Sequence, residues 1–246
     1  MRKQVEKIAT TRFGHRMLSL VMMACILTTT WLGSMNLILR MPDLYLFEFN
    51  RVQMSDQLEL SMSDDELAAV MSNLLLPGAA LPNSYQSETL EGELPLHPKE
   101  IEALHLFQQK ADQSLLILMI SAGSFLQLYL VLFLLEQKKL LRESCSFTVF
   151  GMAGVTLILL LLFLPRDLLW LQSVVLSYGF GGALPPEGIL AGIYSPSLLK
   201  KGLLLLIAFS WVFYFILFQL TILLTKPYQM FQKNYVQVRL DASVRR

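Results

Sequence analysis

The residues best suited to chemistry lie between Leu94 and Asp112, in the segment LPLHPKEIEALHLFQQKAD. This segment holds two of the three histidines of the chain and three carboxylates, and a long apolar run begins at Leu115. An imidazole exchanges protons near neutral pH, so a histidine can act as a general base and then as a general acid. The segment is therefore a candidate for acid–base chemistry beside an apolar helix.

A helix starting at Pro98 would give this segment two distinct faces. Proline suits the first helical turn, where its missing amide hydrogen costs nothing. At about 100° per residue, one face is apolar, and its members are Leu104, Phe107 and Ala111, with Ile101 at the edge. A polar trio borders that face, namely His105, Gln108 and Asp112. The trio either lines a polar pocket at the membrane surface or only keeps an exposed helix hydrated, and the spacing leaves both interpretations open.

The composition identifies the chain as an integral membrane protein. Charged residues make up 16% of it and hydrophobic residues 54%, with a mean hydropathy of +0.51, whereas soluble domains average about 25% charged residues. Four apolar runs without interior charges cover residues 17–39, 115–135, 147–164 and 203–224. A helix needs about 20 residues to cross the hydrocarbon core. We therefore predict one all-α, polytopic domain, residues 1–246, with four transmembrane helices.

The distribution of Lys and Arg predicts the orientation. Thirteen of these residues lie in the two tails, 1–16 and 225–246, and in the turn between the second and third runs. Basic segments stay on the cytoplasmic side. Loops 40–113 and 165–201 are then extracytoplasmic, and both termini are cytoplasmic. The first run is too long for a cleaved signal peptide, so we interpret it as an anchor of a multi-pass cell-membrane protein.

The first loop contains a second helix signal, in SMSDDELAAVMSNLLLPG. Ser63 and Glu66 have capping-box spacing, and Pro77 ends the pattern. An apolar stripe follows at helical spacing, formed by Leu67, Val70, Met71, Leu74 and Leu75. We expect helices near residues 63–76 and 98–113, which together form a helical extracytoplasmic cap between transmembrane helices 1 and 2.

The second loop is apolar but broken by glycines and prolines, so it can lie in the membrane interface or dip into the bilayer. Three of its aromatic residues suit the membrane interface, where the ring is buried and its polar end stays hydrated. They are Trp170, Tyr178 and Tyr194. The Arg166–Asp167 pair is either part of a site or a snorkelling pair at a helix end.

The first half of the chain resembles the bacterial four-span family that includes the lipoprotein intramolecular transacylase (Lit). The resemblance rests on the MSDDELAAVMSNLL helix after the first span and on LHPKEIEALHLF before the second, in which Glu102 and His105 match a Glu-x-x-His motif. The second half matches by span pattern alone. The chain departs from the family in two ways. Gln108 stands where the family motif has an aspartate, and no histidine follows His105.

The resemblance implies acyl transfer at the outer membrane face, from the lipid-modified glyceryl group of a lipoprotein cysteine to the amine of that cysteine. His105 would be the catalytic residue, with Glu102, Gln108, Asp112 and Arg166 in support. The expected partners are a bacterial lipoprotein or phospholipid acyl donor and membrane lipids. The alternative is a non-catalytic relative that binds lipid or a partner membrane protein.

Several other classes of ligand are not expected. The net charge of +1 provides no field for nucleic acid. The two cysteines, Cys25 in an apolar run and Cys145 beside a basic cluster, favour neither a disulfide nor a metal site. We expect no cofactor.

Overall fold

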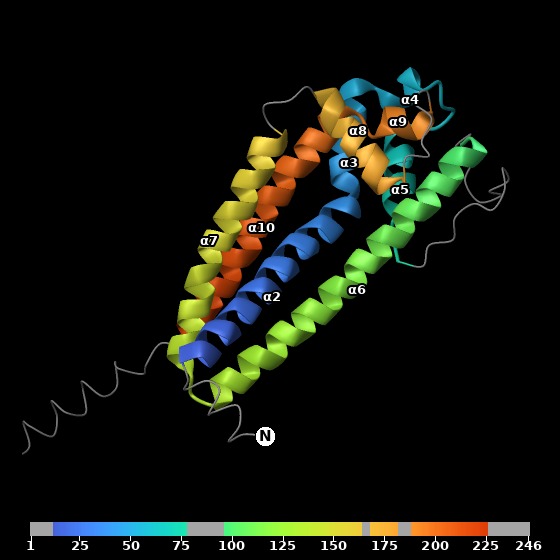
Figure 1. Ribbon diagram of the computed structural model, residues 1–246. Helices are drawn as coiled ribbons and strands as arrows, with labels where there is room; N and C mark the ends of the chain where they lie inside the picture. The colour runs from blue at the N-terminus through green and yellow to red at the C-terminus, as the bar shows by residue number, and fades with distance from the viewer. Residues whose placement is uncertain (1–11, 78–95, 164–167, 182–187, 226–246) are drawn as a thin grey trace, which may run out of the picture.

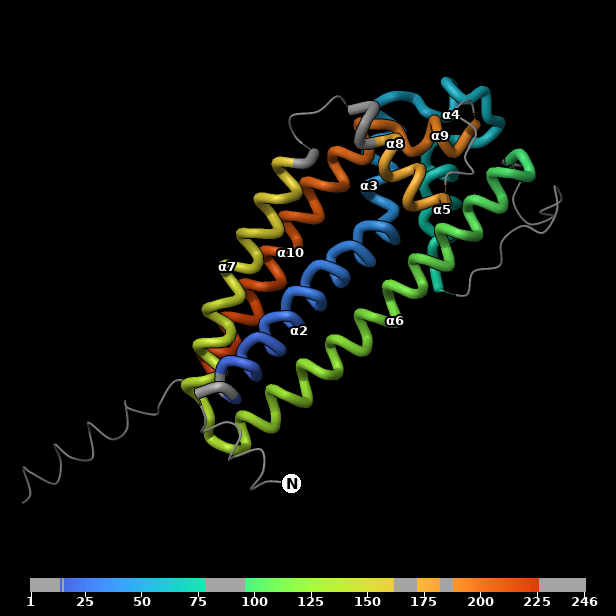
Figure 2. The backbone as a smooth tube through the Cα atoms, viewed as in Figure 1, coloured from blue at the N-terminus to red at the C-terminus, as the bar shows by residue number. Residues whose placement is uncertain are grey.

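The computed structural model describes residues 12–77, 96–163, 168–181 and 188–225, and these residues are helical wherever they form regular structure. The order is α2 (Arg12–Leu39), α3 (Pro42–Val52), α4 (Met54–Gln57), α5 (Asp64–Leu74), α6 (Pro98–Leu134), α7 (Lys138–Phe163), α8 (Leu168–Gly179), α9 (Ile189–Ile193) and α10 (Pro196–Thr225). Four long helices form an elongated bundle, and the short helices gather at one end of it (Figures 1 and 2). We call this the cap end, and the opposite end the tail end.

The prediction of four long apolar helices is confirmed. Helices long and apolar enough to cross a membrane are Arg16–Leu39, Pro98–Leu134, Lys138–Leu161 and Pro196–Thr225. The helices extend beyond the predicted apolar runs, most of all in α6, because polar residues at a membrane surface can continue a helix that apolar residues begin. The chain is a multi-pass membrane protein.

Helix α2 lies at the centre of the bundle, against α6, α7 and α10 (Figure 1). Small polar side chains join it to its neighbours. The Thr29 and Ser121 hydroxyls lie 3.2 Å apart, and Ser121 Oγ donates to the carbonyl of Cys25 at 3.0 Å. The Thr30 hydroxyl reaches Met152 Sδ at 3.6 Å. Such contacts hold apolar helices together where the surrounding lipid gives no hydrophobic driving force.

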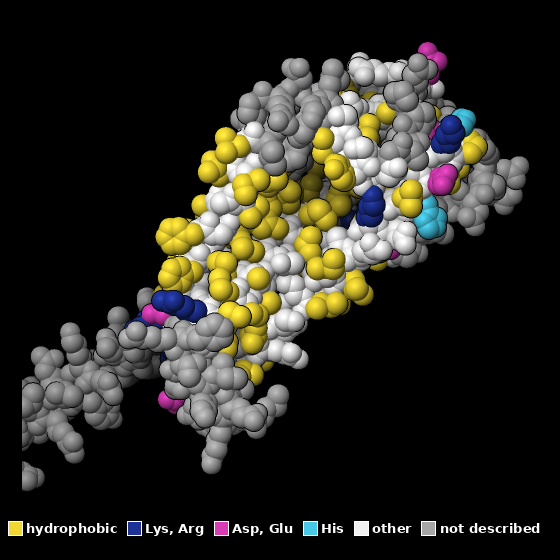
Figure 3. Space-filling model, viewed as in Figure 1, with side chains coloured by type: hydrophobic (Ala, Val, Ile, Leu, Met, Phe, Trp, Pro, Cys, Tyr) yellow, Lys and Arg dark blue, Asp and Glu magenta, His cyan; other side chains and the backbone are white. Residues whose placement is uncertain are grey.

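Large apolar side chains cover the visible outside of the bundle (Figure 3). Met119 is 69% exposed and Phe150 is 74% exposed, on α6 and α7 respectively. An apolar surface of this extent is unfavourable in water and suits hydrocarbon chains. The bundle thus combines interior contacts between polar and apolar side chains with an apolar outer surface.

The cap helix predicted near residues 63–76 is present as α5. Ser63 accepts a hydrogen bond from the Glu66 amide, and the Glu66 carboxylate accepts one from the Ser63 amide, so the predicted capping box is confirmed. Leu67 and Met71 are fully buried, and Val70 and Leu74 are half-buried. The stripe packs in a core that joins α3, α5 and α9 to the cap-end turns of α6 and α10.

Helix α6 begins at Pro98, as predicted, and continues without a break into the second span. His97 caps it: its side chain accepts from the Lys99 amide at 3.3 Å, and the Glu100 carboxylate accepts from the His97 amide at 2.9 Å. The other oxygen of Glu100 accepts from the Leu190 amide at 2.8 Å. One buried carboxylate therefore ties the first turn of α6 to the start of α9.

Candidate functional site

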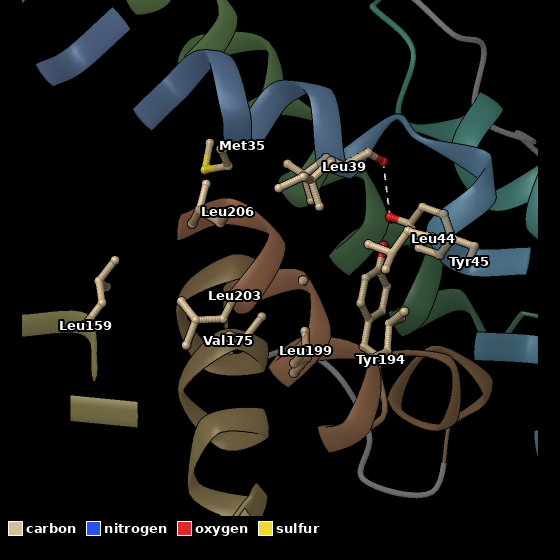
Figure 4. A pocket seen from close by; sticks show the side chains of 13 residues that line it. Met35, Leu39, Leu44, Tyr45, Leu159, Val175, Tyr194, Leu199, Leu203 and Leu206 are labelled. Atoms are coloured by element: carbon tan, nitrogen blue, oxygen red, sulfur yellow. Dashed lines mark hydrogen bonds between the residues drawn. The ribbon is translucent and has the colours of Figure 1, made fainter. Parts of the chain in front are cut away.

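An apolar pocket lies at the cap end of the bundle, where α2, α3, α8 and α10 meet (Figure 4). Its volume is about 310 Å³, within the size range of ligand pockets. Figure 3 shows a hollow bordered by apolar side chains in this region. The lining residues are Met35, Ile38, Leu39, Leu44, Tyr45, Leu159, Val175, Tyr194, Leu198, Leu199, Gly202, Leu203 and Leu206.

The wall formed by α3 depends on a sharp change of direction after α2. Pro42 stands in the first turn of α3, where proline is tolerated, and this new helix points Leu44 and Tyr45 toward α10. The Tyr45 hydroxyl donates to the carbonyl of Leu39 at 3.1 Å and so satisfies one of the free carbonyls at the end of α2. The corner between α2 and α3 is therefore fixed by a side chain that also lines the pocket.

Two tyrosine hydroxyls provide the polar groups of the lining. In Figure 4 the hydroxyls of Tyr45 and Tyr194 lie near one another at one side of the pocket. Burial raises the pKa of Tyr45 to about 12, although a side-chain hydrogen bond with Tyr194 lowers it. Burial, and after it the electrostatic interaction and the hydrogen bond with Tyr45, raises the pKa of Tyr194 well above its ordinary value. Both groups therefore remain protonated.

An aromatic cluster supports Tyr194 from behind. Phe107 of α6 stacks on Phe180, with ring centroids 4.5 Å apart, and Phe180 meets the Tyr194 ring edge-on at 5.1 Å. Phe180 is fully buried and Tyr194 is 3% exposed. Pairs of this kind contribute about 0.5–1.5 kcal/mol each beyond their area. The cluster fixes the Tyr194 ring and links the pocket wall to α6.

The contact between α3 and α10, beside the pocket, also contains a buried carboxylate that is paired with two basic side chains. Glu48 is fully buried, forms an ion pair with Lys201 of α10 and accepts from Arg51 at 2.7 Å. Arg51 also donates to Ser197 at 2.9 Å. Burial raises the pKa of Glu48, but the hydrogen bonds from Lys201, Ser197 and Arg51 outweigh it, and the net pKa is lowered. The carboxylate therefore stays charged and holds α3 against α10.

A second polar network joins α2, α5 and α6. Arg40 Nε donates to the carbonyl of Leu75 at 2.8 Å, and Arg40 also donates to Asn36. Its Nη2 lies 3.7 Å from Asp112 Oδ1. Asn36 donates in turn to Ser114 at 3.0 Å. The network fixes the end of the cap helix α5 to the first two spans, α2 and α6.

The residues predicted to do chemistry are not part of the pocket lining. His105 and Glu102 are exposed on α6, whereas Gln108 is 8% exposed. Asp112 forms its ion pair with Arg40. Arg166 lies outside the described residues. The predicted polar trio thus divides between the helix surface for His105, a buried position for Gln108 and an ion pair in which the Asp112 side chain stays 42% exposed.

The pocket residues themselves were not predicted. Leu44, Tyr45, Glu48 and Phe49 are buried at helical spacing in PDLYLFEFNRV, so the signal for α3 was present, but a charged residue inside the stripe obscured it. Tyr194 was expected to keep its hydroxyl wet at the interface, and this was wrong: the aromatic cluster covers it. Tyr178, in contrast, is 78% exposed.

The fold and the pocket define a class: a four-span helical membrane protein with a helical cap and an apolar pocket between the cap and the spans. No protein-family model matches the chain, and no curated protein or solved structure matches it.

Proposed function

We propose that this protein binds the acyl chain of a membrane lipid in the pocket at the cap end, and that the cap end lies at the outer face of a bacterial cell membrane. The distribution of Lys and Arg supports this orientation. The observation that carries the proposal is the pocket itself. It is lined by apolar side chains from α2, α3, α7, α8 and α10, together with Tyr194, and lies within an apolar outer surface. Lipid chains are the apolar ligands available there at high concentration.

Packing, rather than transfer out of water, would drive this binding. Lipid tails surround the bundle and are as apolar as the pocket, so moving a chain from the bilayer into the pocket gains little hydrophobic free energy. The pocket gains over the bilayer by close contacts around one chain. A lipid-binding role therefore requires the free volume of the pocket.

Gly202 provides a direct test of the free volume. It lines the pocket, and a Cβ added there would meet no atom within 4 Å. Gly202→Leu should fill part of the pocket and remove co-purifying lipid, measured by native mass spectrometry of the whole protein in detergent. The helix itself tolerates the change, because leucine is a better helix former than glycine by about 0.8 kcal/mol.

Gly123→Leu is the matched control. A Cβ at Gly123 also meets no atom within 4 Å, but Gly123 is exposed on α6 and does not line the pocket. We expect this variant to retain the lipid of the wild-type protein. Equal lipid content in both variants would contradict an acyl-chain pocket.

Acyl transfer within a lipoprotein is a second proposal, supported by the Glu102-x-x-His105 resemblance and by a pocket of acyl-chain character nearby. It needs a catalytic imidazole beside the bound ester. His105 is exposed and absent from the pocket lining, which favours lipid binding without chemistry.

A comparison of two histidine variants separates these proposals. If His105 is the general base, His105→Gln should reduce the rearranged lipoprotein by about 10²–10⁴-fold, as read by mass spectrometry of lipoprotein N-termini. His97→Gln is the control, because His97 caps α6 and lies outside the Glu102-x-x-His105 motif. Unchanged N-termini in cells with and without the protein would leave lipid binding as the function.

A further inference from the structure

We propose that Glu48, Arg51, Ser197 and Lys201, here called the α3–α10 cluster, bind the phosphate of an anionic phospholipid whose acyl chain occupies the pocket. This inference rests on the proposed lipid-binding function and adds the charge of the headgroup. It separates a phospholipid from the diacylglyceryl group of a lipoprotein, which carries no phosphate.

The α3–α10 cluster lies directly beside the pocket on both helices. On α3, Leu44 lines the pocket, and Glu48 follows one helical turn later. On α10, Leu198 and Gly202 line the pocket, and Lys201 stands between them in the sequence. Glu48 and Lys201 form an ion pair. The charged contact therefore begins within about one turn of the apolar lining, roughly 5 Å along each helix.

The cluster lies further toward the cap end than the pocket does. Helix α3 runs from the end of α2 into the cap, and α10 begins at the cap end and runs toward the tail end (Figure 1). Arg51, in the last turn of α3, donates to Ser197 in the first turn of α10, whereas Leu203 and Leu206 of the pocket lining lie further along α10. Apolar groups followed outward by basic ones match the order of acyl chain and phosphate in a phospholipid.

The cluster has one positive charge in excess. The buried Glu48 carboxylate is paired with both Arg51 and Lys201. The Arg51 side chain is 51% exposed and meets no second carboxylate within 4 Å among the described residues. Both of its hydrogen bonds leave from Nη2, to Glu48 and to Ser197, and a guanidinium has five N–H donors. Three donors of Arg51 therefore remain for a ligand.

A phosphate suits these donors better than a cationic headgroup does. Hydrogen bonds from arginine to phosphate oxygens are charge-assisted and roughly twice as strong as those between neutral groups. The ammonium of phosphatidylethanolamine would meet the surplus positive charge, because the Glu48 carboxylate is fully buried and already paired. Phosphatidylglycerol carries the phosphate without that ammonium. We therefore expect the site to prefer the anionic lipid.

The test measures the preference of the whole protein, in detergent, for phosphatidylglycerol over phosphatidylethanolamine with the same acyl chains, by competition in native mass spectrometry. We expect a preference of about 5-fold, the equivalent of about 1 kcal/mol for a basic residue near an anionic lipid. Arg51→Gln should bring the ratio close to one, because Glu48 keeps Lys201 as its partner and no surplus charge remains. Arg51→Lys should retain most of the preference.

Two further ligands identify the part of the lipid that is recognised. Diacylglycerol with the same chains has no phosphate, so the wild-type protein and Arg51→Gln should bind it equally. Glycerol phosphate has no chain, and we expect no binding at the lipid concentrations used. Binding of glycerol phosphate as tight as that of the lipid would make a free phosphate the ligand and overturn the inference.

Lys99→Gln is the matched control. Lys99 is exposed in the first turn of α6 and does not line the pocket, so this variant removes the same charge from the same end of the molecule. It should keep the wild-type ratio. The inference is overturned if the wild-type protein shows no preference, if Arg51→Gln keeps that preference, or if Lys99→Gln abolishes it equally. Failure of every lipid, diacylglycerol included, to bind the wild-type protein would instead overturn the acyl-chain pocket itself, so the two failures are distinguishable.

Discussion

The substitution Met71→Asp tests whether the cap is packed against the bundle. Met71 is fully buried in the core shared by α3, α5, α6 and α10. Removing the methionine side chain to alanine size costs about 2–5 kcal/mol. The introduced carboxyl adds a second cost, because deep burial raises the pKa of such a group by roughly 3–5.

The second cost can be estimated at neutral pH. A rise of about 3 in the pKa of the introduced carboxyl lowers the free energy of unfolding by roughly 4 kcal/mol, because each pKa unit corresponds to about 1.36 kcal/mol. The two costs together are of the order of the whole stability of a domain, about 5–15 kcal/mol. We therefore expect Met71→Asp to detach or unfold the cap, seen as a large loss of stability in detergent unfolding followed by circular dichroism.

Ala69→Asp on the same helix is the control. Ala69 is exposed, so its replacement should cost at most about 0.7 kcal/mol, through helix propensity. The burial argument is refuted if the two variants differ by less than about 1 kcal/mol, which is well below the cavity cost alone.

The pH dependence of Met71→Asp gives an independent reading. A pKa raised in the folded state means that the folded protein binds the proton more tightly than the unfolded chain does. Acidification should therefore restore stability to this variant, by roughly 1.4 kcal/mol for each pH unit between the raised pKa and the ordinary value near 4. Absence of this recovery would mean that the introduced carboxyl reaches water.

Three further predictions concern other parts of the chain. Ser63→Ala removes the capping box and should lower stability by about 0.5–2 kcal/mol, measured by the same unfolding assay. Glu48→Gln should lower the free energy of unfolding by about 3 kcal/mol near neutral pH. Because the pKa of Glu48 is lowered in the folded protein, its contribution to stability is present above the ordinary value of 4.5 and is lost as the pH falls below that value. The stabilities of wild type and variant should therefore converge in acid. Cysteines introduced at Ser84 and Lys138 should differ in labelling by an impermeant reagent in intact cells, with Ser84 labelled; labelling at Lys138 alone would reverse the proposed orientation.

The parts of the fold that depend on local signals were predictable. The four spans follow from unbroken apolar runs, and α5 follows from Ser63, Glu66 and the stripe containing Met71. These features need only the spacing of residues along one helix. The cap of α6 at His97 was not predicted, although Glu100 stands at the spacing of a capping box, because histidine is not among the residues that helices prefer at the N-cap.

The pocket could not be predicted, because it exists only through the assembly of distant segments. Tyr45 and Tyr194 are 149 positions apart in the numbering, and Gly202 becomes part of a wall only when α10 packs beside α3. The pairing of Asp112 with Arg40 is of the same kind. The sequence pattern placed Asp112 beside His105 on one helix, but the partner that fixes its carboxylate comes from the end of α2.

The length of α6 has a mechanical consequence. Its 37 residues span about 55 Å at 1.5 Å per residue, whereas the hydrocarbon core is about 30 Å thick. The remaining length extends beyond the hydrocarbon into the cap, where Glu100 ties the first turn of α6 to α9 and Phe107 stacks on Phe180. A long helix adjusts to a thinner bilayer by tilting. We expect such tilting to move Phe107 together with the pocket wall that it supports.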